Sequence, residues 1–291
     1  MNTERPLVPT RPTEDDPRRA SLQRWLESQR ERFGLDARSL QPASNDASFR
    51  RYFRIRGSRL PDGRDTAIVM DAPPPQEDCR PFVHVAQVFA RSGVSVPAVF
   101  ASDLDQGFLL LGDFGNTTYL SQLNPASAPA LYRDASRALV RLQRTSAAGV
   151  LPAYSREVLL RELMLFPDWY LARHKGIALA DAERQVLLDG FERIVANNLA
   201  QPAVFVHRDF HSRNLMVIEA ERNPGILDFQ DALYGPITYD LVSLLRDAYI
   251  RWDEQQVLDW AIRYWEMART ARLPVQADFG EFYRDFEWMG L

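Results

Sequence analysis

The sequence predicts an α+β protein of two lobes, a small β-rich N-terminal lobe and a larger helical C-terminal lobe. Two observations support this class. Short β-rich segments gather between about residues 40 and 111, whereas segments with helical periodicity dominate after Gly112. The 291 residues suffice for both lobes. We therefore expect an arm and a helix at 1–34, the small lobe at 35–112 and the helical lobe at 113–291.

Composition excludes several classes of protein. The chain has 46% hydrophobic and 25% charged residues, which is typical of a globular fold. A single cysteine, Cys79, excludes an intramolecular disulfide framework and fits a reducing compartment. No apolar run approaches the roughly 20 residues that span a bilayer, and no signal peptide is evident. The net charge of −4 argues against nucleic-acid binding. We expect a cytoplasmic protein that acts on small molecules, with no nucleic-acid, membrane or obligate protein partner.

The N-terminal arm is polar and rich in proline, which opposes regular structure. A helix is expected from Arg18 to Phe33, since Leu22 and Trp25 fall on one face with Phe33, and Gly34 follows as a stop signal.

The small lobe alternates strand and turn signals around one helix. β-Rich residues and turn dipeptides predict the strands, and a buried apolar stripe that ends at Gly93 predicts the helix. The expected strands lie near 49–55, at 66–70, at 94–100 with an interruption at Pro97, and at 108–111; the helix lies at 80–92.

The larger lobe is predicted to be helical with one interruption. Apolar residues recur at helical spacing in five segments, at 126–145, 155–174, 180–199, 238–250 and 254–270. Between them, Val204 to Asp228 is expected to form strand, polar loop, strand, turn and strand. An aromatic helical stripe at 279–289 has two interpretations, a C-terminal helix docked on the lobe or a chain cut short of its natural end.

The chemistry-bearing residues lie in the segment that interrupts the helices. A strand leads into His207-x-Asp209, Asn214 follows at the start of a second strand, and a third strand delivers Asp228. The order and spacing match the H-R-D-x-x-x-x-N loop and the D-F metal element of kinases. Magnesium prefers hard oxygen ligands, which Asn214 and Asp228 supply. Asp209 would orient an acceptor hydroxyl and take its proton.

Two other interpretations of this segment stay open. His207, Asp209 and His211 alternate along the chain, so they are able to form the metal triad of a hydrolase. The segment is otherwise a polar loop whose carboxylates face water. In the kinase interpretation, His207 and Arg213 support the loop rather than act as bases.

With these motifs, the chain resembles the aminoglycoside phosphotransferase-like kinases, relatives of the protein kinases that phosphorylate small molecules. The resemblance covers about Leu40 to Ile250. The segments 68–74, 207–216 and 228–231 are most similar to the amino-sugar kinases of bacterial cell-wall recycling. The resemblance implies a bilobal protein-kinase-like fold. It also implies that ATP, with Mg²⁺, phosphorylates the anomeric hydroxyl of N-acetylmuramic acid or N-acetylglucosamine to a sugar 1-phosphate.

The resemblance also assigns nucleotide-binding residues. The segment 44–53 occupies the place of the phosphate-covering hairpin but contains no glycine, so side chains would have to supply donors. The segment 110–113 occupies the place of the inter-lobe hinge, where backbone groups would bind the nucleobase. The nucleotide-binding candidates are Ser44, Asn45, Ser48, Arg50, Arg51, Leu110, Leu111 and Gly112.

One departure from the family concerns its phosphate-binding ion pair. Family members usually carry a lysine on the strand before the first helix and a glutamate on that helix. Met70 ends the corresponding strand here, and the helix segment 80–91 has no acidic residue. The lysine and the glutamate are both missing, which is consistent, because either charge alone would be costly to bury without its partner. Arg50 and Arg51 are the nearest cations, and strand alternation would aim only one of them inward. They are otherwise solvated surface arginines.

The acceptor site is expected beside Asp209. Gln230 and Asp231 follow the metal aspartate directly, and Glu162 and Trp169 lie about two turns apart on one predicted helix. These four are the substrate-binding candidates, with core packing as the alternative for Trp169. Asp240, near a helix N-terminus, is expected to be a structural carboxylate.

Two classes of function follow. The first is a small-molecule kinase, an amino-sugar kinase or one of choline, homoserine or aminoglycoside type. The second is a nucleotide-binding regulator without catalysis, suggested by the missing lysine; the joint presence of Asp209, Asn214 and Asp228 argues against it.

Overall fold

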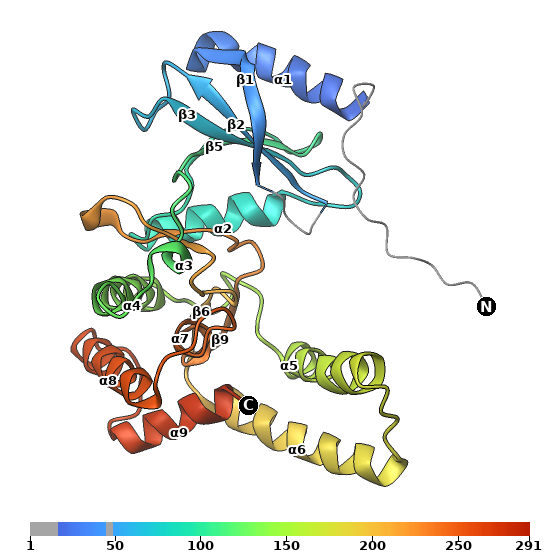
Figure 1. The fold of residues 1–291 in the computed structure, drawn as a ribbon, viewed down its shortest axis with the longest axis vertical. Helices are drawn as coiled ribbons and strands as arrows, with labels where there is room; N and C mark the ends of the chain where they lie inside the picture. The colour runs from blue at the N-terminus through green and yellow to red at the C-terminus, as the bar shows by residue number, and fades with distance from the viewer. Residues whose placement is uncertain (1–16, 45–48) are drawn as a thin grey trace. The chain divides into compact units, whose positions relative to one another are not determined.

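The computed structural model describes residues 17–44 and 49–291, and it divides into two compact units (Figure 1). Unit 1 takes in the chain up to His84 together with Pro97–Asp113, and unit 2 takes in Val85–Val96 together with Phe114–Leu291. The proline-rich arm expected before residue 17 lies outside the described residues.

Unit 1 is a five-stranded antiparallel sheet with one helix packed on it (Figure 1). The strand order is β1-β2-β3-β5-β4. The elements are α1 (Pro17–Phe33), β1 (Leu35–Ser44), β2 (Arg51–Gly57), β3 (Thr66–Asp71), β4 (Val99–Asp103) and β5 (Phe108–Gly112).

Strand β1 was not predicted, because its sequence lacks clean alternation and contains Pro42. It forms as an edge strand through pairing with β2, with two register shifts along the way. The segment 94–100 is interrupted at Pro97, as expected, but less of it is strand than predicted: Ser95 makes an isolated bridge, and β4 begins at Val99.

The two faces of this sheet differ. Directly paired residues of antiparallel strands share a face, and successive residues alternate between faces. The α1 face carries Ile55, Ala67 and Val69, all fully buried against Leu22 and Trp25 of α1. The opposite face therefore carries Tyr52, Arg54, Ile68, Met70, Leu109 and Leu111.

Unit 2 is largely helical. Helix α2 (Arg80–Arg91) begins in unit 1 and its second half belongs to unit 2. The other helices are α3 (Tyr119–Gln122), α4 (Ala128–Arg144), α5 (Arg156–Leu163), the π-helix η1 (Phe166–His174), α6 (Asp181–Ala200), the 3₁₀ turn η2 (Ala220–Arg222), α7 (Tyr239–Leu245), α8 (Glu254–Thr270) and α9 (Phe279–Met289). The strands β6 (Ala203–Val206) and β9 (Leu233–Pro236) form one antiparallel pair, and β7 (Leu215–Met216) and β8 (Gly225–Ile226) form another.

The helix expected at 155–174 is divided. Helix α5 ends at Leu163 and the π-helix η1 follows from Phe166, with Pro167 in its first turn. Proline has no N–H to donate to an α-helical ladder, so the regular helix does not continue through it. Strand β9 was not predicted, because a four-residue strand that contains glycine and proline gives little periodic signal.

Helix α9 docks on unit 2. Phe282 and Phe286 are buried, and Gln201 at the end of α6 donates a hydrogen bond to the backbone oxygen of Asp285 at 3.1 Å. The helix packs against α6, α7 and α8, beside α6 in Figure 1. Its aromatic stripe is therefore used within the unit. Among the helices that the structure describes, none combines the length and apolar character needed to cross a membrane.

Candidate active site

The loop of interest joins the two short strand pairs of unit 2. Strand β6 ends at Val206 and leads directly into His207, Arg208 and Asp209. Asn214 immediately precedes β7, and Asp228 lies two residues after β8. Leu215 pairs with Ile226, and Leu227 N donates a hydrogen bond to Asn214 O at 2.9 Å. These contacts bring Asn214 close to Asp228.

Two carboxylates accept hydrogen bonds from the backbone of this loop. Asp240, in the first turn of α7, accepts hydrogen bonds from His207 N at 2.7 Å and Arg208 N at 3.0 Å. Asp247, just after α7, accepts one from Ser212 N at 2.9 Å. Arg208 needs such support, since its φ of 80° lies in the left-handed region that costs energy for a residue with a Cβ.

Burial raises the pKa of Asp240 to about 7, against the effect of its two backbone hydrogen bonds, which favour the charged form. Sequence reasoning placed Asp240 near a helix N-terminus but missed Asp247 and its role. An aspartate two residues beyond the end of a helix has no sequence feature that distinguishes it from a surface residue.

His207 is a structural residue of the loop. Its Nε2 lies 2.9 Å from the backbone oxygen of Leu227, and its Nδ1 accepts a hydrogen bond from Asp209 N at 3.2 Å. The ring is therefore neutral, with its proton on Nε2. Complete burial lowers its pKa to about 4.

These contacts exclude the metal-triad interpretation of His207, Asp209 and His211, because both ring nitrogens of His207 are engaged with the backbone. In residues 17–44 and 49–291, no group of three or more histidine, cysteine, aspartate or glutamate side chains is placed to hold a metal ion.

Three polar side chains converge at the mouth of the loop. Asn214 Nδ2 donates to the backbone oxygen of Asp209 at 3.1 Å and lies 3.4 Å from Asp228 Oδ2. Asp209 and Asp228 are exposed. The pKa of Asp209 is raised, first because the surrounding protein removes part of the carboxylate from water and second because of the negative charge of Asp228. A raised pKa makes a carboxylate a better proton acceptor.

Gln230 and Asp231 lie beside the same carboxylate. Gln230 Nε2 donates to Asp228 Oδ1 at 2.9 Å and to Asp231 Oδ2 at 3.2 Å. Gln230 therefore orients Asp228, in addition to the substrate-binding role predicted from the sequence. Arg213 is exposed, and its guanidinium lies 4.7 Å from the centre of the Tyr249 ring.

Glu162 has two partners within unit 2. Its carboxylate accepts hydrogen bonds from the guanidinium of Arg208 and the hydroxyl of Tyr154. Helix α5 is thereby tied to the residue beside Asp209. Sequence reasoning missed Tyr154 and Arg208, since neither position carries a local signal.

Trp169 lies on η1 with 56% of its surface exposed, and Arg173 stacks 4.0 Å above its ring. The core-packing alternative for Trp169 is therefore wrong.

The predicted nucleotide-binding residues belong to unit 1. Ser44 ends β1, and Asn45 and Ser48 lie outside the described residues. Leu110 and Leu111 lie in β5, an inner strand paired on both sides, and Gly112 N donates to Ala98 O at 2.9 Å. Leu110 and Leu111 are paired within the sheet, and the assignment of nucleobase binding to this segment stays a prediction.

Arg50 and Arg51 have separate partners. Arg50 Nε donates to Glu77 at 3.0 Å, whereas Arg51 Nε donates at 2.9 Å to the fully buried Asp71. Asp71 also accepts from Arg18 of α1, so Arg51 is held on the α1 face of the sheet. The interpretation of both arginines as solvated surface residues is wrong.

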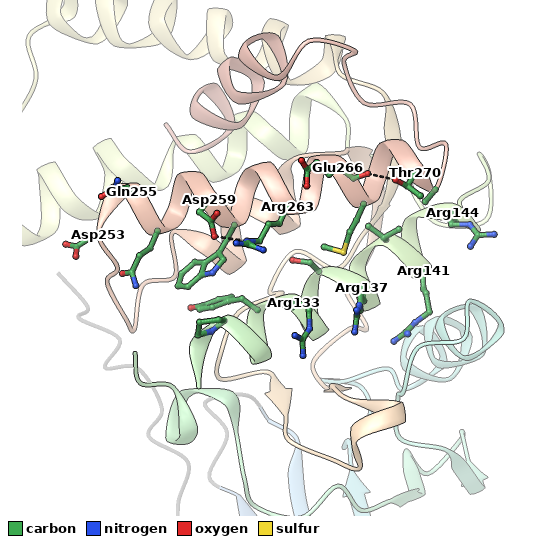
Figure 2. A pocket seen from close by; sticks show the side chains of 18 residues that line it. Arg133, Arg137, Arg141, Arg144, Asp253, Gln255, Asp259, Arg263, Glu266 and Thr270 are labelled. Atoms are coloured by element: carbon green, nitrogen blue, oxygen red, sulfur yellow. Dashed lines mark hydrogen bonds and ion pairs between the residues drawn. The ribbon is translucent and has the colours of Figure 1, made fainter. Parts of the chain in front are cut away.

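A groove of unit 2 that is separate from these residues lies between α4 and α8 (Figure 2). Its volume is about 1130 Å³. Arg133, Arg137 and Arg141 project from α4, opposite the Asp259–Arg263 pair of α8 (Figure 2). None of its lining residues is among the site residues predicted from the sequence.

Known proteins resemble this chain in sequence over most of its length. A model of the phosphotransferase enzyme family matches residues 39–273. An N-acetylmuramate/N-acetylglucosamine kinase of Pseudomonas aeruginosa is 49% identical over 284 residues, which are 95% of this chain and 82% of that protein. A protein of the same name from Neisseria meningitidis serogroup B is 48% identical, over 94% of this chain and 80% of its own length.

Solved structures resemble it in fold. An aminoglycoside phosphotransferase of Streptomyces rimosus in complex with ADP and streptomycin has a TM-score of 0.57 and 15% identity, covering 93% of this chain and 99% of its own. An ethanolamine kinase of Plasmodium vivax has a TM-score of 0.58 and 9% identity, covering 87% and 73%. The kinase-like fold predicted from the sequence is confirmed.

Proposed function

The chain belongs to the phosphotransferase enzyme family, and from this premise we propose that it transfers the terminal phosphoryl group of ATP to N-acetylmuramate or N-acetylglucosamine. Relatives that are 44–49% identical over most of this chain carry the names of these two sugars. We place the reaction at the anomeric hydroxyl and in the cytoplasm.

The observation that carries the proposal is the meeting of Asp209, Asn214 and Asp228 on one anchored loop. In the proposed reaction the acceptor oxygen attacks the terminal phosphorus of ATP, its proton passes to Asp209, and ADP leaves. The raised pKa of Asp209 suits this role. A regulator without catalysis would have no use for a proton acceptor beside two oxygen ligands.

The same residues fit a magnesium ion. Asn214 and Asp228 offer an amide oxygen and a carboxylate, the hard donors that Mg²⁺ prefers, and two protein ligands are usual where phosphates and water complete the shell. Asn214 and Asp228 would hold the ion, while Gln230 keeps Asp228 oriented. When bound, the ion neutralises negative charge on the nucleotide phosphates.

The choice of the anomeric hydroxyl rests on chemistry as well as on resemblance. This hydroxyl is more acidic than the other hydroxyls of the ring, so a carboxylate assists its deprotonation more easily. For the sugar itself, we propose contacts with Asp231 and with the exposed ring of Trp169, which is able to stack on a pyranose.

The test is ADP release from purified protein with a panel of acceptors. N-acetylglucosamine and N-acetylmuramate should give ADP, whereas choline, homoserine and an aminoglycoside should give none above background. The 1-O-methyl glycoside of N-acetylglucosamine should be inert, and phosphorus NMR should show a 1-phosphate. Equal turnover of the glycoside, or a 6-phosphate product, would reject the anomeric assignment. ADP release only with an acceptor outside the amino sugars would reject the substrate class.

A further inference from the structure

A kinase needs a cation on the nucleotide phosphates, and this chain lacks it at the usual place. In protein kinases a lysine of strand β3 pairs with a glutamate of the following helix. Here β3 reads TAIVMD and α2 reads RPFVHVAQVFAR, so β3 has no cation and α2 has no carboxylate. The position of Met70 is nevertheless informative, because it identifies the sheet face from which such a cation would project.

That face is the one opposite α1. Met70 pairs directly with Tyr52 of β2, and directly paired residues of antiparallel strands point to the same side. Residues on the α1 face, such as Val69, pack on Leu22 and Trp25 instead. A cation that replaces the lysine must therefore share a side with Tyr52 and Met70.

Arg50 meets this condition. It lies two residues before Tyr52, and its guanidinium hydrogen-bonds the Tyr52 hydroxyl, so both side chains lie on one side of the sheet. The side chain of Arg51 points to the other face of the sheet, since it and Arg18 of α1 both bind the buried Asp71.

Arg54 also lies on the side of Met70, but Asp113 holds it through two hydrogen bonds of 2.6 and 3.0 Å. That bidentate pair holds Arg54 against a carboxylate whose side chain is only 3% exposed, and a buried pair of this kind is costly to break.

Arg50 has a carboxylate partner of its own. Its Nε donates to Glu77 at 3.0 Å, and the two side chains are only 15% and 14% exposed. Glu77 lies in the connection from β3 to α2, where its backbone N donates to Pro73 O at 3.1 Å. The pair thus joins the residue that immediately precedes β2 to the connection that precedes α2. A guanidinium has five N–H donors, so Arg50 is able to keep these partners and bind phosphate oxygens as well.

We propose that Arg50, held in position by Glu77, is the cation that binds the nucleotide phosphates in this protein, in place of the lysine–glutamate pair of β3 and the following helix. The proposal rests on the function proposed above. Arg50 contacts the nucleotide, and Glu77 is a positioning residue that acts through Arg50.

The test is nucleotide binding by calorimetry with Mg²⁺ and no sugar present. The Arg50→Gln variant should bind ATP and ADP ~10- to 100-fold more weakly than the parent, because it lacks a charged donor to the phosphates. Adenosine, which has no phosphate, should bind Arg50→Gln as it binds the parent. Arg50→Lys keeps the charge and should recover part of the affinity. Arg80→Gln is the matched control, because Arg80 is an exposed arginine three positions after Glu77 in the sequence and pairs with Asp78 and Asp105.

Glu77→Gln should weaken ATP binding less than Arg50→Gln, and it should weaken it little further when Arg50 is already glutamine. Additive losses would show that Glu77 acts independently of Arg50. Unchanged ATP affinity in Arg50→Gln, or an equal loss for adenosine, would overturn the assignment of Arg50.

These outcomes are separate from the sugar-kinase proposal. Parent protein that binds ATP but phosphorylates no amino sugar would reject that proposal and leave the binding test of Arg50 intact. Conversely, an active amino-sugar kinase whose Arg50→Gln variant binds ATP normally would reject the present inference alone.

Discussion

Asp209 is the side chain on which the proposed chemistry depends most directly. Asp209→Asn keeps its size but removes the proton acceptor, so turnover with N-acetylglucosamine should fall ~10²- to 10⁴-fold. Nucleotide affinity and the midpoint of thermal unfolding should stay close to those of the parent, since the side chain is exposed. Steady-state kinetics at saturating substrates measure the loss. Turnover within a few-fold of the parent would remove Asp209 from this role.

His207 and Asp240 give the loop two opposite pH dependences. The folded-state pKa of His207 is lowered to about 4, so the unfolded chain takes up its proton first and stability falls as the pH drops from about 6.5 to 4. The folded-state pKa of Asp240 is raised to about 7, so the native state holds a proton that the unfolded chain releases. Its contribution to stability is present at low pH and is lost as the pH rises from about 4 to 7.

Urea unfolding between pH 7.5 and 5 should separate these two contributions. In Asp240→Asn the unfolding free energy should fall more steeply on acidification than in the parent, by up to about 1.4 kcal/mol per pH unit, because the stabilising proton uptake is gone. In His207→Gln it should fall less steeply. Parallel pH profiles for all three proteins would contradict the two shifts.

Among the elements, α5 and α7 hold the catalytic loop from two directions. Helix α7 does so through Asp240 and, just beyond its end, Asp247, which bind backbone N–H groups. Helix α5 does so through Glu162, which receives the guanidinium of Arg208. The first arrangement sets the backbone path, and the second sets the side chain next to Asp209.

Glu162→Gln should therefore lower turnover about tenfold through misplacement of the loop, with a smaller change in the KM for ATP. Glu157→Gln, an exposed glutamate on the same helix, is the matched control and should leave turnover unchanged. If both variants retain parental kinetics, the contact between α5 and the loop has no positioning role. Recovery of turnover in Glu162→Asp would support that role.

At the scale of the whole molecule, each of the two units buries hydrophobic residues of its own. Val69 is buried in the sheet of unit 1, and Phe286 of α9 is buried in unit 2. Phe286→Ala should cost about 3–5 kcal/mol of stability. Hydrogen exchange should accelerate in α6, α7 and α9 and remain near parental rates in β2 and β3, because local stability follows the core that is damaged. Val69→Ala should give the reverse pattern, and equal acceleration in both units would show a single cooperative core.

Much of the fold and the order of the catalytic-loop residues could be predicted from local sequence. The α+β division, most helices and the order of His207, Asp209, Asn214 and Asp228 follow from patterns within short segments. The loop could be predicted because only two short strands and a turn separate its residues. Spacing along the chain therefore nearly determines spacing in the structure.

Other features depend on contacts between distant segments. Arg208 meets Glu162 across 46 positions, His207 meets Asp240 across 33, and Arg50 meets Glu77 across 27. Neighbouring arginines 50 and 51 look equivalent in the sequence, yet one binds Glu77 and the other a buried aspartate on the α1 face. Periodicity within a segment describes which face a residue occupies, but the partner on that face comes from packing with elements that local sequence does not specify.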